Sequence, residues 1–340
     1  MTSSPGSPTW RAYVLTTAVA ALLLAGCSAE GSAPPPDGVP ETAPQPRVLF
    51  QGVGPDHLLL GVARLDGSDV RYPLEGLPGG DQTNPEWSPD GSQVLLAVSD
   101  GGRDDLWIAD ADGTGARKLL DCEAACRWLD DPSWSPDGSS VVYSRTVARG
   151  RTGWGSLEQV DVTTGEVSVI VPARLRTFTA GARWSPDGSQ VVFESVHKAS
   201  PGLEAEIDGV SLRIVELATG EVGPALTEPD LFAATADWSP DGSAIVYSAL
   251  AEPDAGAPDL FVLPPAGGEP RRVTTVADRG GYAAEPTWRA DSTRIVFSGQ
   301  LPGSFRAGVL LTVSVDGEGE PVELGATTIV GRHPRVEPGA

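Results

Sequence analysis

The sequence predicts an all-β fold, a six-bladed β-propeller of four-stranded antiparallel blades, on three observations. The pentapeptide Trp-Ser-Pro-Asp-Gly recurs at Trp87, Trp134, Trp184 and Trp238, and a weaker copy, Trp-Arg-Ala-Asp-Ser, begins at Trp288. The copies are spaced by 47, 50, 54 and 50 residues, a period typical of propeller blades. The 41 Gly and 31 Pro in 340 residues favour many turns over long helices.

Each copy predicts the same order of strands. After the turn comes a β-branched run, at residues 93–96, 140–143, 190–193, 244–247 and 294–297. A variable loop follows, then a second apolar strand that ends in a tight Gly-containing turn, and then a last strand. Four short antiparallel strands per repeat are typical of one blade.

Residues 47–83 predict a blade that lacks its first strand. They contain three apolar runs, at 48–50, 58–62 and 70–72. The missing strand is expected at the other end of the chain, where 333–339 aligns with 84–90 and Val336 takes the place of the tryptophan. We expect this C-terminal strand to pair with the N-terminal blade and close the ring.

The repeated Trp-Ser-Pro-Asp-Gly followed by Val-Val-Tyr or Val-Val-Phe resembles the TolB-like six-bladed β-propeller family, a WD40-like repeat, over residues 47–340. The resemblance implies the architecture. It leaves the activity open, because this fold carries both binding modules and enzymes.

The first 46 residues predict export and anchoring. An apolar run at 13–24 has the length of a signal-peptide core, and Leu24-Ala25-Gly26-Cys27 resembles the lipobox of bacterial lipoproteins. The resemblance implies a signal peptide over 1–26, a lipid on Cys27, and attachment to the membrane through that lipid. An ordinary secretory signal with a coincidental cysteine is the alternative. Residues 27–46 read as a Pro-rich tether, so the propeller at 47–340 is expected outside the cytoplasm, in the cell envelope.

Charge excludes one class of partner. With 24 basic and 46 acidic residues the formal net charge is −22, and such a surface repels phosphate backbones and anionic lipid headgroups. We therefore expect no nucleic-acid partner. The sequence predicts no cofactor and no metal site.

The repeated aspartates and the cysteine pair have structural interpretations. Ser-Pro-Asp-Gly is turn chemistry, although one acid per repeat could also serve as a calcium ligand. Cys122 and Cys126 are the only cysteines beyond Cys27, and in an oxidising envelope they predict a disulfide that pins a loop. A metal or redox site is the alternative.

The positions one and three residues before each tryptophan, and before Val336, are mostly polar, while the position between them is only Pro or Ala. Alternation with a period of two would place both positions on one face of the innermost strand, which lines the central channel of a propeller. The candidate channel-lining residues are Asn84, Glu86, Asp131, Arg183, Asp237, Glu285, His333 and Arg335. A water-filled hole and a ligand site are both open interpretations.

The loops predict where a partner binds. Turns after the first and third strands are short and alike, whereas the loops on the opposite face are long and differ from one another. Variable loops on a rigid scaffold commonly carry recognition, and Arg and aromatic residues are enriched at binding hot spots. The candidate binding residues are Arg149, Arg151, Trp154, Arg174, Arg176, Phe178, Phe232, Arg279, Tyr282, Phe305 and Arg306. Some of these aromatics could instead fill the interior of loops.

The sequence contains no recognisable catalytic motif, and three histidines leave few ways to build a catalytic triad. We therefore predict a monomeric ring that acts as a non-catalytic binding module for an envelope protein or cell-wall component. Two alternatives remain. One is a glycan- or lactone-acting enzyme that uses the carboxylates of the channel. The other is a sensor that binds a small ligand or calcium.

Overall fold

Each Trp-Ser-Pro-Asp-Gly copy is a turn between two antiparallel strands. In the first copy the Ser88 hydroxyl donates to Asp90 at 2.6 Å and accepts from the Gln93 N–H at 2.9 Å, while Asp90 also accepts the Ser92 N–H at 3.0 Å. Gly91 has a φ of +68°, which its missing Cβ allows without strain. The same bonds recur at Asp137, Asp187 and Asp241. The motif aspartates therefore close turns.

The computed structural model describes residues 46–325 and 329–338. The predicted signal peptide, the lipidated Cys27 and the tether up to residue 45 lie outside the described residues. Within the described part of the chain, no helix has both the length and the apolar composition needed to cross a membrane.

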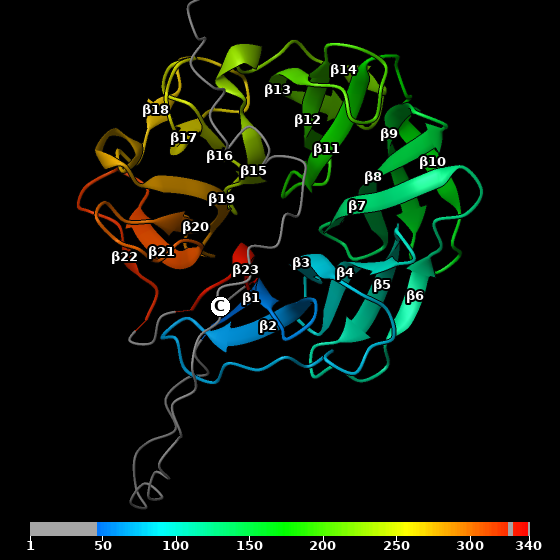
Figure 1. Cartoon of the computed structure of the whole chain (residues 1–340), viewed down its shortest axis with the longest axis horizontal. Helices are drawn as coiled ribbons and strands as arrows, with labels where there is room; N and C mark the ends of the chain where they lie inside the picture. The colour runs from blue at the N-terminus through cyan, green and yellow to red at the C-terminus, as the bar shows by residue number, and fades with distance from the viewer. Residues whose placement is uncertain (1–45, 326–328, 339–340) are drawn as a thin grey trace, which may run out of the picture. The chain divides into compact units, whose positions relative to one another are not determined.

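The structure is all-β and is dominated by antiparallel strands (Figure 1). One sheet has the order β2–β1–β23, from β1 (Arg47–Val53), β2 (Leu58–Arg64) and β23 (Arg332–Val336). A larger sheet contains β3 (Gln82–Trp87), β4 (Gln93–Asp100), β5 (Arg103–Asp110), β6 (Arg117–Leu120), β7 (Cys126–Trp134), β8 (Ser140–Arg149), β9 (Thr152–Asp161) and β10 (Val167–Val171).

Three further sheets each have four strands in chain order. They are β11 (Thr177–Trp184), β12 (Gln190–Lys198), β13 (Ile207–Glu216) and β14 (Glu221–Val222); β15 (Ala234–Trp238), β16 (Ile245–Ala249), β17 (Asp259–Leu263) and β18 (Arg271–Arg272); and β19 (Tyr282–Trp288), β20 (Arg294–Gln300), β21 (Val309–Ser314) and β22 (Val322–Glu323). Short 3₁₀ helices, Pro229–Leu231 and Ala277–Arg279, precede β15 and β19.

Two details differ from the expected arrangement of strands. The larger sheet divides into two antiparallel groups, β3–β6 and β7–β10, which are joined by one parallel pairing between Asp104 and Trp128. The apolar run expected to form a strand at 70–72 contributes only a bridge between Val62 and Arg71. β23 does pair with β1, with Val336 opposite Val48.

The hydrophobic core lies between neighbouring sheets. Leu95 and Leu106 of one group pack with Trp134 and Tyr143 of the next. Similar clusters join each sheet to the following one, and Val296 and Leu310 from the β19–β22 sheet pack against Val48 and Phe50 of β1. In Figure 1 the sheets of this unit surround a common centre, with β3, β7, β11, β15, β19 and β23 nearest to it.

The motif tryptophans also connect neighbouring sheets. The Trp238 indole N–H donates to the Arg183 carbonyl at 3.2 Å, and that of Trp288 donates to the Asp237 carbonyl at 3.2 Å. The Trp87 indole donates to the carbonyl of Arg335 in β23 at 3.1 Å. A bulky side chain that is both apolar and a donor satisfies a buried carbonyl while filling the core.

The longest variable loops are shorter than expected because their strands continue. Residues 145–154, which follow the second predicted strand of their repeat, form the outer part of the β8–β9 hairpin, whose tip is Arg149-Gly150-Arg151. Strands β12 and β13 likewise extend, which leaves the loop 199–206. In antiparallel four-stranded sheets, these second-to-third connections lie on the same face as the connections to the next sheet. We call this the irregular face, and the face with the Ser-Pro-Asp-Gly turns the uniform face.

Candidate functional site

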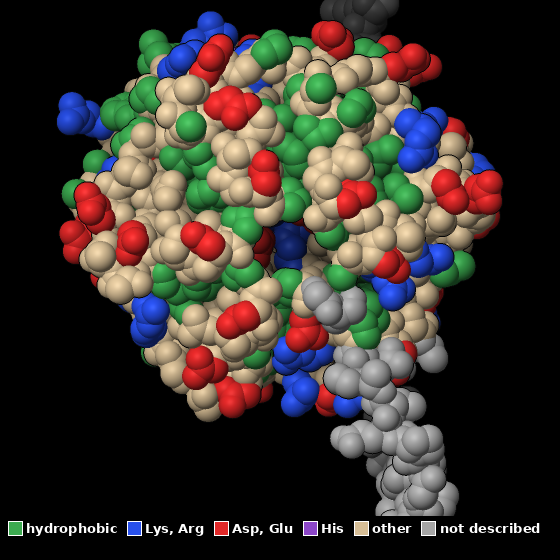
Figure 2. All heavy atoms as spheres, turned by 180° about the vertical axis from the view of Figure 1, so that it is seen from behind, with side chains coloured by type: hydrophobic (Ala, Val, Ile, Leu, Met, Phe, Trp, Pro, Cys, Tyr) green, Lys and Arg blue, Asp and Glu red, His purple; other side chains and the backbone are tan. Residues whose placement is uncertain are grey.

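The residues one before each tryptophan converge near the centre of the sheets. Glu86 of β3 accepts a hydrogen bond from the Ser133 hydroxyl at 3.1 Å. Its Oε2 lies 3.4 Å from Nε of Arg335 and 3.7 Å from Nε of Arg183. Both arginines are over nine-tenths buried. Figure 2 shows one face of the molecule, where a Lys or Arg side chain lies at the floor of a central hollow surrounded by acidic side chains.

Burial shifts the titration of two carboxyls in this central cluster. The pKa of Glu86 is raised by desolvation, although Arg183 and the Ser133 hydroxyl oppose that shift. The pKa of Asp237 is raised to about 6, again chiefly by burial, and Arg183 opposes the rise. Asp237 accepts the backbone N–H of Trp288 at 3.1 Å. Both carboxyls therefore balance buried cations or bind neighbouring backbone.

The sequence predicts that the residues one and three positions before each tryptophan lie on the same face of the strand. The structure interrupts this regular alternation between the two positions. In β3 the register with β4 shifts between Thr83 and Glu86, and corresponding shifts occur in β7, β11, β15 and β19 and between β1 and β23. A bulge at this point puts two residues opposite one. The bulged residue has positive φ in every copy: Asn84 49°, Asp131 50°, Gly181 57°, Thr235 53°, Glu285 55° and His333 47°.

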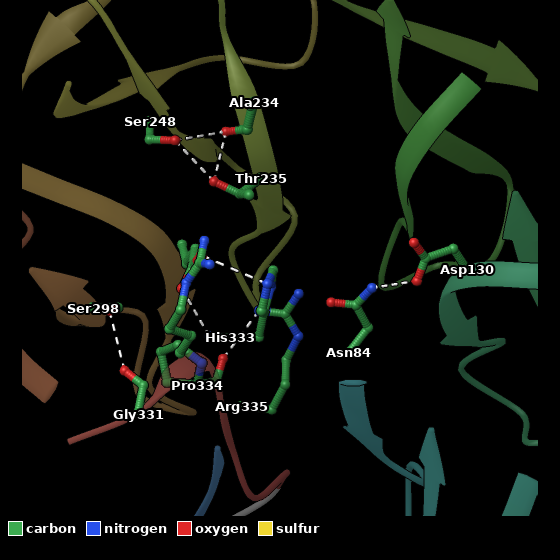
Figure 3. A network of polar contacts seen from close by, with 12 residues as sticks. Asn84, Asp130, Ala234, Thr235, Ser248, Ser298, Gly331, His333, Pro334 and Arg335 are labelled. Atoms are coloured by element: carbon green, nitrogen blue, oxygen red, sulfur yellow. Dashed lines mark hydrogen bonds and ion pairs between the residues drawn. The ribbon is translucent and has the colours of Figure 1, made fainter. Parts of the chain in front are cut away.

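Polar side chains near the bulges bind the neighbouring sheet. Asp131 accepts the Gly181 N–H at 2.8 Å, and Glu285 accepts the His333 N–H at 2.9 Å. Figure 3 shows Asn84 of β3 turned toward Asp130 of β7, to which its amide donates. The Asp131 and Glu285 bonds cross from one sheet to the next, and the Asn84 bond joins the two strand groups of the larger sheet, so these polar groups hold the strands together around the centre.

Glu285 has a second set of partners. Its Oε1 accepts from Nε of Arg332 at 2.9 Å and lies 3.5 Å from Nε2 of His333. Burial opposes ionisation of Glu285, but His333 and Arg332 together outweigh it, and the net result is a lowered pKa. The pKa of His333 is itself lowered, mainly by burial.

Two residues of the central region were not among those predicted from the sequence. Glu194 of β12 accepts the Thr235 N–H at 2.6 Å, and its pKa is raised to about 7 by burial, with a further contribution from Asp131. Arg332 contacts Glu285, as described above. Little in the sequence indicated Glu194, because it lies on the second strand of its sheet and no acidic residue recurs at that position in the other repeats.

The chemistry available at the centre is that of ion pairs and cross-sheet hydrogen bonds. Every carboxylate predicted to line the channel, namely Glu86, Asp131, Asp237 and Glu285, contacts a cation or the backbone of another sheet. Across 46–325 and 329–338, no three His, Cys, Asp or Glu side chains are grouped so that they could hold a metal ion.

The disulfide between Cys122 and Cys126 is confirmed, and both cysteines are buried. It closes the connection between β6 and β7 on the irregular face. The Cys122 N–H donates to Asp105 at 2.7 Å, and Lys118 bridges Asp105 and Asp121. The loop is thus fixed both covalently and by charge.

Most of the aromatic candidates for the binding face fill loop interiors. Phe178 is buried, packs with Val196 and Val210, and carries the Lys198 ammonium 4.5 Å from its ring centroid. Phe232 packs against the same cluster. Trp154 is half-buried. Three of the five aromatic candidates thus present little or only part of their surface, because the loop residues around them need a core of their own.

Tyr282, at the start of β19, and Phe305, in the connection between β20 and β21, differ in exposure. Tyr282 is half-buried, and its hydroxyl accepts the Gly308 N–H at 2.8 Å. The loop that this bond fixes holds Phe305 fully exposed. Ser304 supports the loop by accepting the Arg306 N–H on its hydroxyl at 3.1 Å. A large aromatic side chain held in solvent by an ordered loop is typical of a binding surface.

The basic candidates remain at the surface. Arg149, Arg151, Arg174, Arg176, Arg279 and Arg306 are all exposed. Arg176 lies 3.5 Å from Asp208, and Arg279 lies 2.5 Å from Glu320. Three exposed apolar residues of the irregular face were missed: Val53, Leu175 and Val330. Single apolar loop residues give no sequence pattern by which they could have been chosen.

Comparison with known protein sequences finds similarity over a short stretch only. No family model matches the chain. A 33-residue stretch is 58% identical to the Tol-Pal system protein TolB of Anaeromyxobacter dehalogenans strain 2CP-C, and it covers 10% of this chain and 8% of that protein. The same identity and coverage hold for TolB of Anaeromyxobacter sp. strain K. The chain thus matches only a small part of the length of these relatives.

Solved structures match over most of the chain. The TolB structure from Acinetobacter baumannii superposes with a TM-score of 0.65 at 19% identity, covering 86% of this chain and 67% of that one. A putative TolB from Agrobacterium tumefaciens gives 0.59 at 18% identity, covering 84% and 89%. An oligogalacturonate lyase in complex with manganese gives 0.52 at 19%, covering 84% and 73%. Structural similarity at such low sequence identity indicates a shared fold and does not indicate a shared function. The chain therefore has a TolB-like β-propeller fold.

Proposed function

We propose that this protein is a lipid-anchored, extracytoplasmic six-bladed propeller that acts as a non-catalytic binding module for an envelope protein or cell-wall component. Six blades follow if β3–β6 and β7–β10 are counted separately and β23 completes the blade of β1 and β2. The pairing of β23 with β1 and the Trp87–Arg335 hydrogen bond support a closed ring.

The observation that carries the proposal is the make-up of the irregular face. Leu175, with 67% of its surface exposed, the fully exposed Phe305 and the half-exposed Val330 lie on it. Burying such side chains against a partner would stabilise a complex by about 25 cal/mol for each Å² of apolar surface removed from water.

The central contacts favour binding over catalysis. The channel carboxylates suggested for a glycan- or lactone-acting enzyme are the ones that bind arginines and neighbouring backbone, and removing them would disturb the assembly of sheets. The likeness to an oligogalacturonate lyase is one of fold. The relatives named as Tol-Pal system proteins support a role among envelope proteins.

The experiment is a cross-linked pull-down from an envelope fraction. The full chain is compared with a variant of the irregular face, Leu175→Ser/Phe305→Ser/Val330→Ser. The matched control is Val167→Ser/Val169→Ser/Val322→Ser, which removes three exposed valines from the outer strands β10 and β22. Melting temperatures verify that each variant folds.

We expect one partner to be retained by the wild type and the control and lost by the irregular-face variant. Retention by all three proteins, or loss by both variants while they remain folded, would contradict the proposed face. Turnover of a sugar or lactone by the purified domain, abolished in Glu86→Gln, would contradict the non-catalytic assignment.

A further inference from the structure

The irregular face contains two segments whose charge is opposite to that of the protein. Residues 145–157 and 171–180 include five arginines and no acidic residue, in a chain with a net charge of −22. The first segment is the tip of the β8–β9 hairpin, and the second is the connection from β10 to β11. Such a local reversal of sign in an acidic protein is typical of an electrostatic recognition site.

The loop 199–206, which carries the exposed Glu204 and Glu206, lies between these segments. The Leu203 N–H donates to the Arg151 carbonyl at 2.9 Å, and the Gly153 N–H donates to the Pro201 carbonyl at 3.2 Å. At the next strand, the Lys198 N–H donates to the Arg176 carbonyl at 3.0 Å. Main-chain bonds thus hold the hairpin tip to the loop 199–206 and the turn at 174–177 to Lys198, the residue that precedes this loop.

Three of the five arginines are not neutralised. Arg145 lies 3.6 Å from the buried Glu158, and Arg176 lies 3.5 Å from Asp208. Arg149, Arg151 and Arg174 are exposed and make no ion pair within the described part of the chain. We name these three residues, together with the exposed Leu175, the arginine platform.

We propose that the arginine platform binds an acidic segment of a partner protein, with carboxylates on the three arginines and an apolar side chain against Leu175. The inference deepens the proposed function and rests on it. Guanidinium groups bind carboxylates through paired hydrogen bonds, which gives an arginine surface a geometric preference for Asp and Glu side chains. Leu175, between Arg174 and Arg176, adds an apolar contact to that charged surface.

Charge favours a protein over a membrane as the acidic occupant. A broad anionic lipid surface would also meet the acidic remainder of the domain, which carries the net charge of −22. A short acidic segment can contact the three arginines while facing only the two acidic residues of the neighbouring loop, Glu204 and Glu206.

The probe is a short fluorescein-labelled peptide of Glu, Asp and Leu, titrated by fluorescence anisotropy with the full chain. The platform variant is Arg149→Gln/Arg151→Gln/Arg174→Gln. The matched control, Arg64→Gln/Arg117→Gln/Arg271→Gln, removes three exposed arginines at the uniform-face ends of their strands and changes the net charge equally. A Lys and Leu peptide and vesicles of phosphatidylglycerol are the other ligands.

We expect the acidic peptide to bind the wild type and the control alike and the platform variant about tenfold more weakly, with an affinity that falls as salt is raised. Leu175→Ser should weaken binding without changing the salt dependence. Equal binding by all three proteins, equal weakening in the control, no binding of the peptide, or binding of the vesicles instead would overturn the proposal.

The outcome is separable from that of the proposed function. If the irregular-face variant loses the pull-down partner while the peptide does not bind the wild type, the binding module stands and the arginine platform is wrong. If the peptide binds but no envelope partner is retained, the platform is an acidic-peptide site and the envelope role is wrong.

Discussion

The indole N–H of Trp87 donates to the backbone carbonyl of Arg335 at 3.1 Å, although the two residues are 248 positions apart in the chain. Arg47 completes this junction, because its guanidinium lies 4.5 Å above the Trp87 ring and forms an ion pair with Glu337. Trp87 therefore contacts residues from both the beginning and the end of the described chain.

This junction predicts a difference between two tryptophans. Trp87→Phe leaves the buried Arg335 carbonyl without its donor, whereas Trp134 is equally buried and its indole nitrogen makes no hydrogen bond in the described structure. We expect Trp87→Phe to lower the free energy of unfolding by about 1–2 kcal/mol more than Trp134→Phe. Urea denaturation of both variants measures this. Equal losses would mean that the hydrogen bond contributes nothing beyond packing.

A second prediction concerns pH and Glu194. The folded protein holds the Glu194 proton more tightly than the unfolded chain, because burial raises the pKa from 4.5 to about 7. This group therefore makes the free energy of unfolding fall as pH rises from about 4.5 to about 7. Glu194→Gln removes the ionisation while keeping an oxygen for the Thr235 N–H.

We expect Glu194→Gln to exceed the wild type in unfolding free energy by about 1–3 kcal/mol at pH 8, and the difference to shrink toward pH 5. Denaturation series at several pH values test this, with the exposed Glu166→Gln as the control. A difference that does not depend on pH would show that Glu194 stays ionised in the folded protein.

A third prediction concerns the disulfide. The bond between Cys122 and Cys126 closes a loop of few residues, so it constrains the unfolded chain only modestly. Cys122→Ala/Cys126→Ala should lower the free energy of unfolding by about 2 kcal/mol and leave the fold intact. Calorimetry of the variant, and of the wild type with and without a reducing agent, provides the measurement. Unfolding of the reduced protein at room temperature would contradict this estimate.

A fourth prediction tests the loop contact beneath the arginine platform. A Cβ on Gly153 would lie 2.0 Å from Cδ2 of Leu203, so Gly153→Ala forces the Leu203 side chain out of its packed position against the hairpin. We expect a loss of about 1–3 kcal/mol, much of it recovered in Gly153→Ala/Leu203→Ala. Thermal melts compare the two variants with Leu203→Ala alone. Failure of the double variant to recover would place the strain elsewhere.

The sequence predicted the elements that depend on local pattern. The turn residues and the β-branched runs that follow them form strands where expected, and the alignment of Val336 with the tryptophans anticipated its pairing with Val48. These features follow from side-chain alternation and turn chemistry, both of which are visible in one repeat.

The bulge was not predicted, because a period of two was assumed through the whole first strand. A signal existed: Asn84 and Asp131 tolerate positive φ better than most residues, and each precedes a proline, which disfavours right-handed helical geometry. Burial of Phe178 could not be foreseen, because it depends on packing against Val196 of β12 and Val210 of β13 in the same sheet. Exposure of Leu175 depends on tertiary packing in the same way.

The two ends of the described chain meet closely enough to be joined. The Glu337 N–H donates to the Arg47 carbonyl at 2.9 Å, beside the ion pair between the same residues. A circularly permuted chain, linked from Pro338 to Pro46 and opened at the exposed Gly101-Gly102 hairpin tip, should keep every pairing of strands. The point at which the polypeptide is interrupted can thus be moved around the molecule while the architecture stays the same.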